Sequence, residues 1–131
     1  MLDHLTLTVV APDFGARAGF YDAALGALGL VRVLELVDEE EDRPAVEAVA
    51  WGPPDGAGLI WLVIGEQPTT GVHVRLRADS RVQVETFHAD AVRAGGAEHA
   101  APRRWVLYRR GEFNAIVADP AGNLIEAIAA E

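Results

Sequence analysis

Apolar and polar residues alternate along two short segments of the chain, residues 4–10 and 72–77. Every second residue is apolar, which is typical of a strand with one face against the core. The polar face carries His4 in the first segment and His73 in the second. We therefore predict two strands whose histidines point away from the core.

Each of these strands is followed by a segment whose apolar residues are spaced as on one face of a helix. The first helix is expected to be capped by Asp13 and to run to about Leu28, before Gly29. The second is expected to begin at the capping-box pattern Ser80-Arg81-Val82-Gln83 and to end at Gly95-Gly96.

Short apolar runs between turn residues predict three more strands in each half of the chain. They are residues 31–37, 45–51 and 59–64 in the first half, and residues 97–100, 113–118 and 124–129 in the second. Asp119-Pro120-Ala121-Gly122 is expected to be a tight turn. Residues 103–110 are expected to form an exposed loop, or a lid with an aromatic wall and a cationic rim.

The two halves have the same order of elements and share short motifs. His4-Leu5-Thr6-Leu7 is similar to His73-Val74-Arg75-Leu76, and Phe20 and Gly29 are matched by Phe87 and Gly96. We predict an α+β fold of two βαβββ modules, about residues 1–66 and 72–131, which form a curled mixed sheet with helices on its outer face.

Composition limits the chemistry that this chain can do. Its 131 residues are enough for one domain, residues 1–131. Without cysteine, a metal must be held by His, Asp, Glu or other oxygen ligands. All 11 basic residues are Arg, so Schiff-base chemistry on lysine is excluded.

The net charge of −9 argues against partners that are nucleic acids or anionic membranes. There is no apolar run long enough to span a membrane and no signal-type start, so we expect a cytoplasmic protein.

Strand parity also places a carboxylate with the two histidines. In the last predicted strand Ile125 and Ala127 take the helix side, which leaves Glu126 on the open face. If the strands that carry His4, His73 and Glu126 meet in one curved sheet, two imidazoles and a carboxylate suit Fe, Mn, Zn or Ni as the divalent ion.

Several motifs together resemble the vicinal oxygen chelate superfamily of glyoxalases, bleomycin resistance proteins and extradiol dioxygenases. They are Asp3-His4-Leu5-Thr6-Leu7, Phe20-Tyr21, Leu28-Gly29-Leu30, His73-Val74-Arg75-Leu76, Ala94-Gly95-Gly96-Ala97 and Asp119-Pro120-Ala121-Gly122-Asn123-Leu124-Ile125-Glu126. The resemblance covers nearly the whole chain, and the last motif is the most specific.

The resemblance implies paired βαβββ modules around a metal and a substrate with adjacent oxygens. It implies metal ligands at His4, His73 and Glu126, with Glu126 also the catalytic residue. It also implies a homodimer, which would cover exposed strand edges. Glyoxalase-type members have a fourth ligand where this chain has Trp61, and Trp cannot bind a metal.

Other residues have two interpretations each. Arg75 and Arg77 either form an anion clamp for the substrate or are solvated strand arginines. Trp61 either lines a substrate pocket, together with Trp51, or packs in the core. Tyr108 is the residue of the 103–110 segment most suited to bind substrate. His88 and His99 are expected to be structural or surface residues.

Three functions fit these observations. The first is a divalent-metal-dependent lyase, isomerase or dioxygenase acting on a small substrate with vicinal oxygens, different from a glutathione-dependent glyoxalase I. The second is a metal-free acidic dimer that sequesters a small molecule, as bleomycin resistance proteins do. The third is a small-molecule sensor domain.

Overall fold

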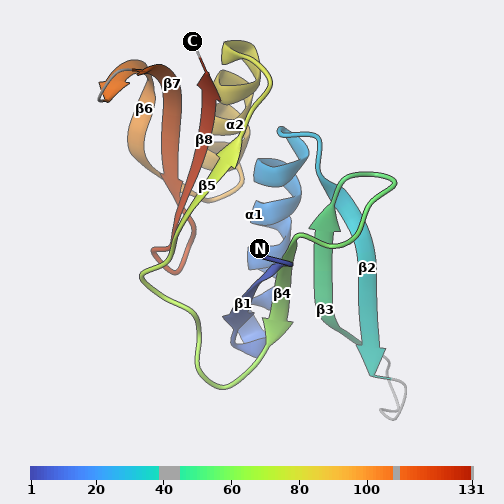
Figure 1. The fold of residues 1–131 in the computed structure, drawn as a ribbon. Coiled ribbons are helices and arrows are strands. Elements are labelled where there is room, and N and C mark those ends of the chain that lie inside the picture. Colours follow the sequence, from blue (N-terminus) through green and yellow to red (C-terminus); the bar gives the residue numbers. More distant parts are fainter. Residues whose placement is uncertain (39–44, 108–109, 131) are drawn as a thin grey trace.

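A computed structural model of the protein describes residues 1–38, 45–107 and 110–130 (Figure 1). The first module contains β1 (Leu5–Val9), a 3₁₀ turn η1 (Ala11–Asp13), α1 (Phe14–Gly26), β2 (Val31–Asp38), β3 (Ala45–Gly52) and β4 (Ile60–Ile64). The second contains β5 (His73–Arg77), α2 (Arg81–Arg93), β6 (Ala97–Leu107), β7 (Arg110–Ala118) and β8 (Leu124–Ala130). Within the described residues, no helix is both long enough and apolar enough to cross a membrane.

Each module forms its own four-stranded mixed sheet. Sheet A has the strand order β1-β4-β3-β2, and sheet B has the equivalent order β5-β8-β7-β6. In both sheets the first and last strands of the module are parallel, and the remaining pairs are antiparallel. The predicted α+β fold with two βαβββ modules is confirmed, and the described strands do not close into a barrel.

One hydrophobic core runs through both modules. Leu7 and Val9 of β1 are buried on the helix side of sheet A, as the alternation predicted. Phe20 of α1 and Phe87 of α2 are completely buried in the same cluster. In Figure 1, α1 lies between the two sheets. The core side of each sheet is therefore closed by helices, and the polar strand faces are left for a site.

A buried polar cluster joins α1 to the turn between β7 and β8. The Tyr21 hydroxyl donates a 2.6 Å hydrogen bond to Asp119 Oδ2, and Arg17 Nη1 lies 3.7 Å from the same oxygen. The backbone N–H groups of Ala121 and Asn123 donate to Asp119 Oδ1, which closes the predicted turn. Burial and the Asp119 carboxylate raise the pKa of Tyr21, so its hydroxyl remains a donor. This cluster ties the first module's helix to the second module's sheet.

Three predictions at helix ends have different outcomes. Ser80 caps α2 as predicted, because its hydroxyl accepts a 3.1 Å hydrogen bond from the backbone N–H of Gln83. Asp13 stands at the N-cap position of α1 as predicted, but its side chain makes no capping hydrogen bond, and η1 leads directly into α1. The conformational match of Gly29 is Gly95, not Gly96, because Gly29 and Gly95 have positive φ angles of 84° and 106°.

The segment expected to be an exposed loop continues β6 as far as Leu107, so that prediction was wrong for its described part. Arg103 pairs with Asn114 across the sheet, and Trp105 pairs with Glu112. Register shifts on either side of Ala100 allow the strand to continue past Pro102. Two side chains of this segment are thereby fixed on one face of sheet B.

Candidate functional site

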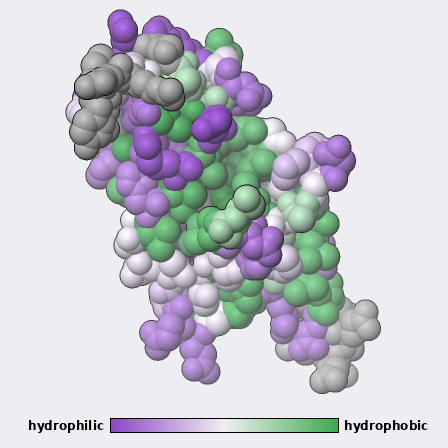
Figure 2. All heavy atoms as spheres, in the orientation of Figure 1, coloured by the Kyte–Doolittle hydropathy of each residue, from purple (hydrophilic) through white to green (hydrophobic). Residues whose placement is uncertain are grey.

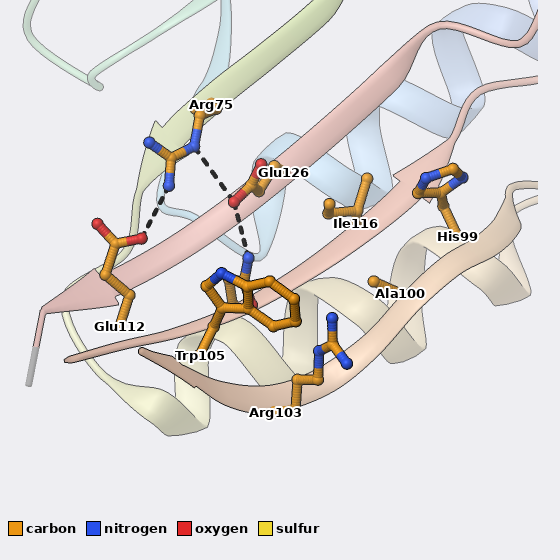
Figure 3. Close-up of a pocket in the computed structure, with 9 residues that line it drawn as sticks. Arg75, His99, Ala100, Arg103, Trp105, Glu112, Ile116 and Glu126 are labelled. Carbon is orange, nitrogen blue, oxygen red and sulfur yellow. Dashed lines mark hydrogen bonds and ion pairs between the residues drawn. The ribbon is translucent and has the colours of Figure 1, made fainter. Parts of the chain in front are cut away.

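Glu126 on β8 is the centre of a polar cluster on the open face of sheet B. Its side chain is 4% exposed, and its Oε1 lies 2.8 Å from His73 Nε2 on β5. Its Oε2 accepts a 2.8 Å hydrogen bond from Asn114 Nδ2 on β7 and lies 3.2 Å from Arg75 Nε. Arg75 Nη2 also donates a 2.9 Å hydrogen bond to Glu112 (Figure 3).

The Glu126 carboxyl is held in its charged form by these neighbours. Burial disfavours the charge, but the hydrogen bonds from Asn114 and His73 and the charge of Arg75 outweigh it and lower the pKa of Glu126. For Arg75, burial likewise opposes the charge, and its two carboxylate partners outweigh that effect and raise the pKa of the guanidinium. The cluster is therefore an ionised network with a fixed geometry.

A cavity of about 400 Å³ opens beside this cluster. It lies on the face of sheet B away from the helices, and Figure 3 shows its walls. Its lining residues come from β5, β6, β7 and β8: Arg75, His99, Ala100, Arg103, Trp105, Glu112, Asn114, Ile116 and Glu126. This volume is in the range of small-molecule sites.

Sheet A carries a smaller counterpart of the cluster. The ring centroids of His4 and Trp61 are 5.7 Å apart. In sheet A, Thr6 pairs with Trp61; in sheet B, Arg75 pairs with Glu126. In each sheet the histidine stands two residues before that pair, so His4 and Trp61 occupy the positions of His73 and Glu126. The strand register therefore shows which residues of the two modules are equivalent. The shared sequence motifs alone did not show this.

The structure brings two of the three predicted metal ligands together in one chain. The 2.8 Å between His73 Nε2 and Glu126 Oε1 is the length of a hydrogen bond. An imidazole nitrogen and a carboxylate are both donor types that divalent ions use. His4 lies on the other sheet, and among the described residues no three His, Asp or Glu side chains of one chain are grouped to hold a metal.

The other candidate residues have varied positions. Arg75 contacts Glu126 and Glu112 on the cavity wall, while Arg77 is exposed at the end of β5. His99 lines the cavity. His88, expected to be structural, pairs with Glu98 at 2.6 Å. Tyr108 lies outside the described residues.

Trp51 and Trp61 do not share a face, contrary to the sequence interpretation. Trp51 pairs with Ile60, and Trp61 pairs with Ala50, so the two indoles project from opposite sides of sheet A. Trp51 is buried beside Tyr21, and its Nε1 donates to Asp22. Trp61 is half-buried on the side of His4. The error arose because face assignment across an antiparallel pair depends on register as well as on parity.

Sequence reasoning missed Asn114, which orients the carboxylate. It is 8% exposed and is a buried amide within an otherwise apolar stretch of β7. The available signal was a polar residue inside an apolar strand, because a buried polar side chain nearly always has a hydrogen-bond partner.

The duplicated βαβββ fold, with a histidine–carboxylate pair beside a cavity, defines the class of this protein. A family model described as a glyoxalase-like domain matches residues 5–128. The chain belongs to this family, which confirms the predicted membership of the vicinal oxygen chelate superfamily.

Solved structures agree with this assignment. A glyoxalase/bleomycin resistance protein from Albidiferax ferrireducens T118 is 25% identical, with 98% of each chain covered and a TM-score of 0.79. A glyoxalase/bleomycin resistance protein/dioxygenase family enzyme from Burkholderia phytofirmans PsJN is 15% identical over 96% of this chain and 97% of the other, with a TM-score of 0.61. A lactoylglutathione lyase from Agrobacterium tumefaciens is 19% identical over 95% and 91%, with a TM-score of 0.59. The last two show the fold alone.

No curated protein sequence matches this chain.

Proposed function

We propose that this protein is a divalent-metal-dependent enzyme that acts on a small substrate with vicinal oxygens. The observation that carries the proposal is the equivalence of the two half-sites. His4 stands to Trp61 in sheet A as His73 stands to Glu126 in sheet B. His4, His73 and Glu126 would therefore form one ligand set where the face of sheet A that carries His4 meets the face of sheet B that carries His73 and Glu126.

We propose further that the two faces come from different copies of a homodimer. Within one chain the half-sites lie on separate sheets, so the partner subunit's His4 would join His73 and Glu126. The edge strand β2 supports an assembly, because Val31, Leu34, Leu36 and Val37 are each 40–49% exposed. Figure 2 also shows apolar side chains gathered between the sheets on the face in view. Exposed apolar surface of this kind is typical of interfaces.

The residues of the site would have separate roles. A divalent ion bound there would polarise two adjacent substrate oxygens as a Lewis acid, whether it is Fe, Mn, Zn or Ni. Glu126, kept ionised by its neighbours, would bind the ion and accept a proton from the substrate. Asn114 and Arg75 would fix the orientation of that carboxylate.

The proposed reaction is an isomerisation, lyase or dioxygenase step other than that of a glutathione-dependent glyoxalase I. A proton shuttle between adjacent carbons needs a base on each side of the substrate. Trp61 occupies the position where sheet A would supply the second base, and an indole N–H only donates.

Metal analysis of the purified protein tests this proposal. We expect about one divalent ion per chain, as one ligand set per chain implies. His73→Ala should abolish uptake while the melting temperature stays near that of the wild type, because the side chain is 44% exposed and lies outside the hydrophobic core. His99→Ala, which removes a cavity imidazole that does not contact Glu126, is the matched control. Equal metal content in His73→Ala and wild type would overturn the site.

Mixed dimers test whether the site is shared between subunits. His4→Ala and His73→Ala should each bind no metal alone. After the two variants are unfolded together and refolded, one site per mixed dimer is intact, so the mixture should recover about a quarter of the wild-type metal content. A mixture that recovers no metal while each variant still forms dimers would show that the site is not shared.

A metal-free ligand-binding protein is the second candidate, and Arg75 favours it. Its guanidinium already forms ion pairs with both Glu126 and Glu112, and a bound cation would otherwise be the partner of these carboxylates. In this case the dimer would sequester a small molecule in the same cavity. Purified protein that takes up no divalent ion but binds a small ligand would support this candidate over the first.

A further inference from the structure

The cavity wall formed by β6 carries a guanidinium whose charge is not compensated within the described residues. The Arg103 guanidinium carbon lies 3.9 Å from the ring centroid of Trp105, so it is stacked on the indole. No carboxylate of the described residues forms an ion pair with it. Arg75, on the opposite wall, is bridged between Glu112 and Glu126. Arg103 is therefore the arginine of the cavity lining that is available for an anion.

A second group in the cavity lacks a partner. Asn114 uses its amide nitrogen to donate to Glu126, which fixes the direction of the amide. Its Oδ1 is buried and accepts no hydrogen bond from any described residue. Buried carbonyl oxygens are nearly always hydrogen-bonded. Asn114 lines the cavity, so a small movement of its side chain or its neighbours that exposes Oδ1 would let a ligand donate a proton to it.

Strand pairing places these two groups side by side. Arg103 and Asn114 are direct partners across β6 and β7, and Trp105 and Glu112 form the next pair on the same face. Side chains of Ala100 and Ile116 complete an apolar part of the lining. A flat ring fits against such a surface, with one edge at Arg103 and Asn114.

We propose that this cavity binds a planar, aromatic carboxylate that also carries a hydroxyl group. The carboxylate would pair with the Arg103 guanidinium, the hydroxyl would donate to Asn114 Oδ1, and the ring would lie against Trp105 and Ile116. This inference rests on the proposed function for the location of the site, and it adds the class of ligand. The contacts between this ligand and the protein require no metal.

Binding of three probes to the EDTA-treated protein tests this inference by calorimetry. 3-Hydroxybenzoate has both groups, phenol lacks the carboxylate and benzoate lacks the hydroxyl; none of them has adjacent oxygens on the ring. We expect 3-hydroxybenzoate to bind about tenfold more tightly than phenol, the effect of one charge-assisted hydrogen bond. It should also bind severalfold more tightly than benzoate.

Arg103→Gln should reduce the preference for 3-hydroxybenzoate over phenol to near unity, with the affinity for phenol unchanged. Arg104→Gln is the matched control, because it removes one charge from the next residue of β6, which pairs with the core residue Phe113 on the other face. A preference that survives in Arg103→Gln, or no binding of 3-hydroxybenzoate to the wild type, would overturn the inference. Failure of metal uptake with the carboxylate preference intact would overturn the proposed function alone.

Discussion

The two half-sites are built on the same strand positions but with different side chains. In sheet B, Glu126 pairs with Ile116 on β7, and Ile128 pairs with Asn114. In sheet A the equivalent pairs are Trp61 with Ala50 and Val63 with Ala48. One half therefore has a carboxylate fixed by an amide and a guanidinium. The other has an indole beside two small residues.

This difference shows which half provides the chemistry. A histidine stands at the same position in both sheets, but only sheet B surrounds it with groups that hold a charge in place. In sheet A the neighbourhood of Trp61 is close-packed, because a Cβ added to Gly58 would lie 3.1 Å from the indole Nε1. We infer that sheet A supplies a wall and one imidazole, and that sheet B supplies the carboxylate.

The largest effect is expected from Trp61→Glu, which gives sheet A a carboxylate at the position that Glu126 has in sheet B. The wild type should show negligible conversion of the methylglyoxal–glutathione hemithioacetal, with or without added Ni(II) or Zn(II). Trp61→Glu should increase the rate of lactoylglutathione formation about 10²–10⁴-fold, the usual contribution of a positioned base. Trp61→Gln, which removes the same indole without adding a base, should stay inactive. Rapid turnover by the wild type would show that sheet A needs no carboxylate.

A smaller effect is expected from making sheet B resemble sheet A. Asn114 and Ala48 occupy equivalent positions in the two sheets, so Asn114→Ala makes this position of sheet B the same as in sheet A. The substitution also removes the amide that donates to Glu126. We expect metal affinity to fall about 10–100-fold, as is typical when a partner of a ligating group is lost. Competition with a chromogenic chelator measures the affinity, and His99→Ala provides the control. An unchanged dissociation constant would mean that Asn114 does not orient the carboxylate.

The smallest effect concerns the acid stability of the first module. Burial disfavours the charge of Asp22, but hydrogen bonds from Arg32 and Trp51 outweigh it and lower the pKa of the carboxyl. A lowered folded-state pKa stabilises the protein above the unfolded-state value of about 3.9, and this stability is lost as the pH falls through the folded-state pKa. Between about pH 5 and about pH 3, the melting temperature of the wild type should therefore fall more steeply than that of Asp22→Asn. Parallel curves would contradict this assignment.

Strand alternation was enough to predict the face of His73 and of Glu126, because a period of two fixes which side of a sheet a residue takes. It did not predict that His4 lies on a separate sheet, since the placement of two sheets depends on how α1 and α2 pack. The extent of β6 was also missed. Its polar residues are those of an exposed strand face, and register shifts carry the strand past Pro102. Asn114 was overlooked because its role depends on a partner in another strand.

The contact between Tyr21 and Asp119 spans 98 residues of sequence. At synthesis rates of about 5–20 residues per second, Asp119 leaves the ribosome about 5–20 s after Tyr21. During this interval α1 has a hydroxyl and a guanidinium without the carboxylate that they share in the native protein. The first module therefore cannot complete its own interior, and the last turn of the chain closes it.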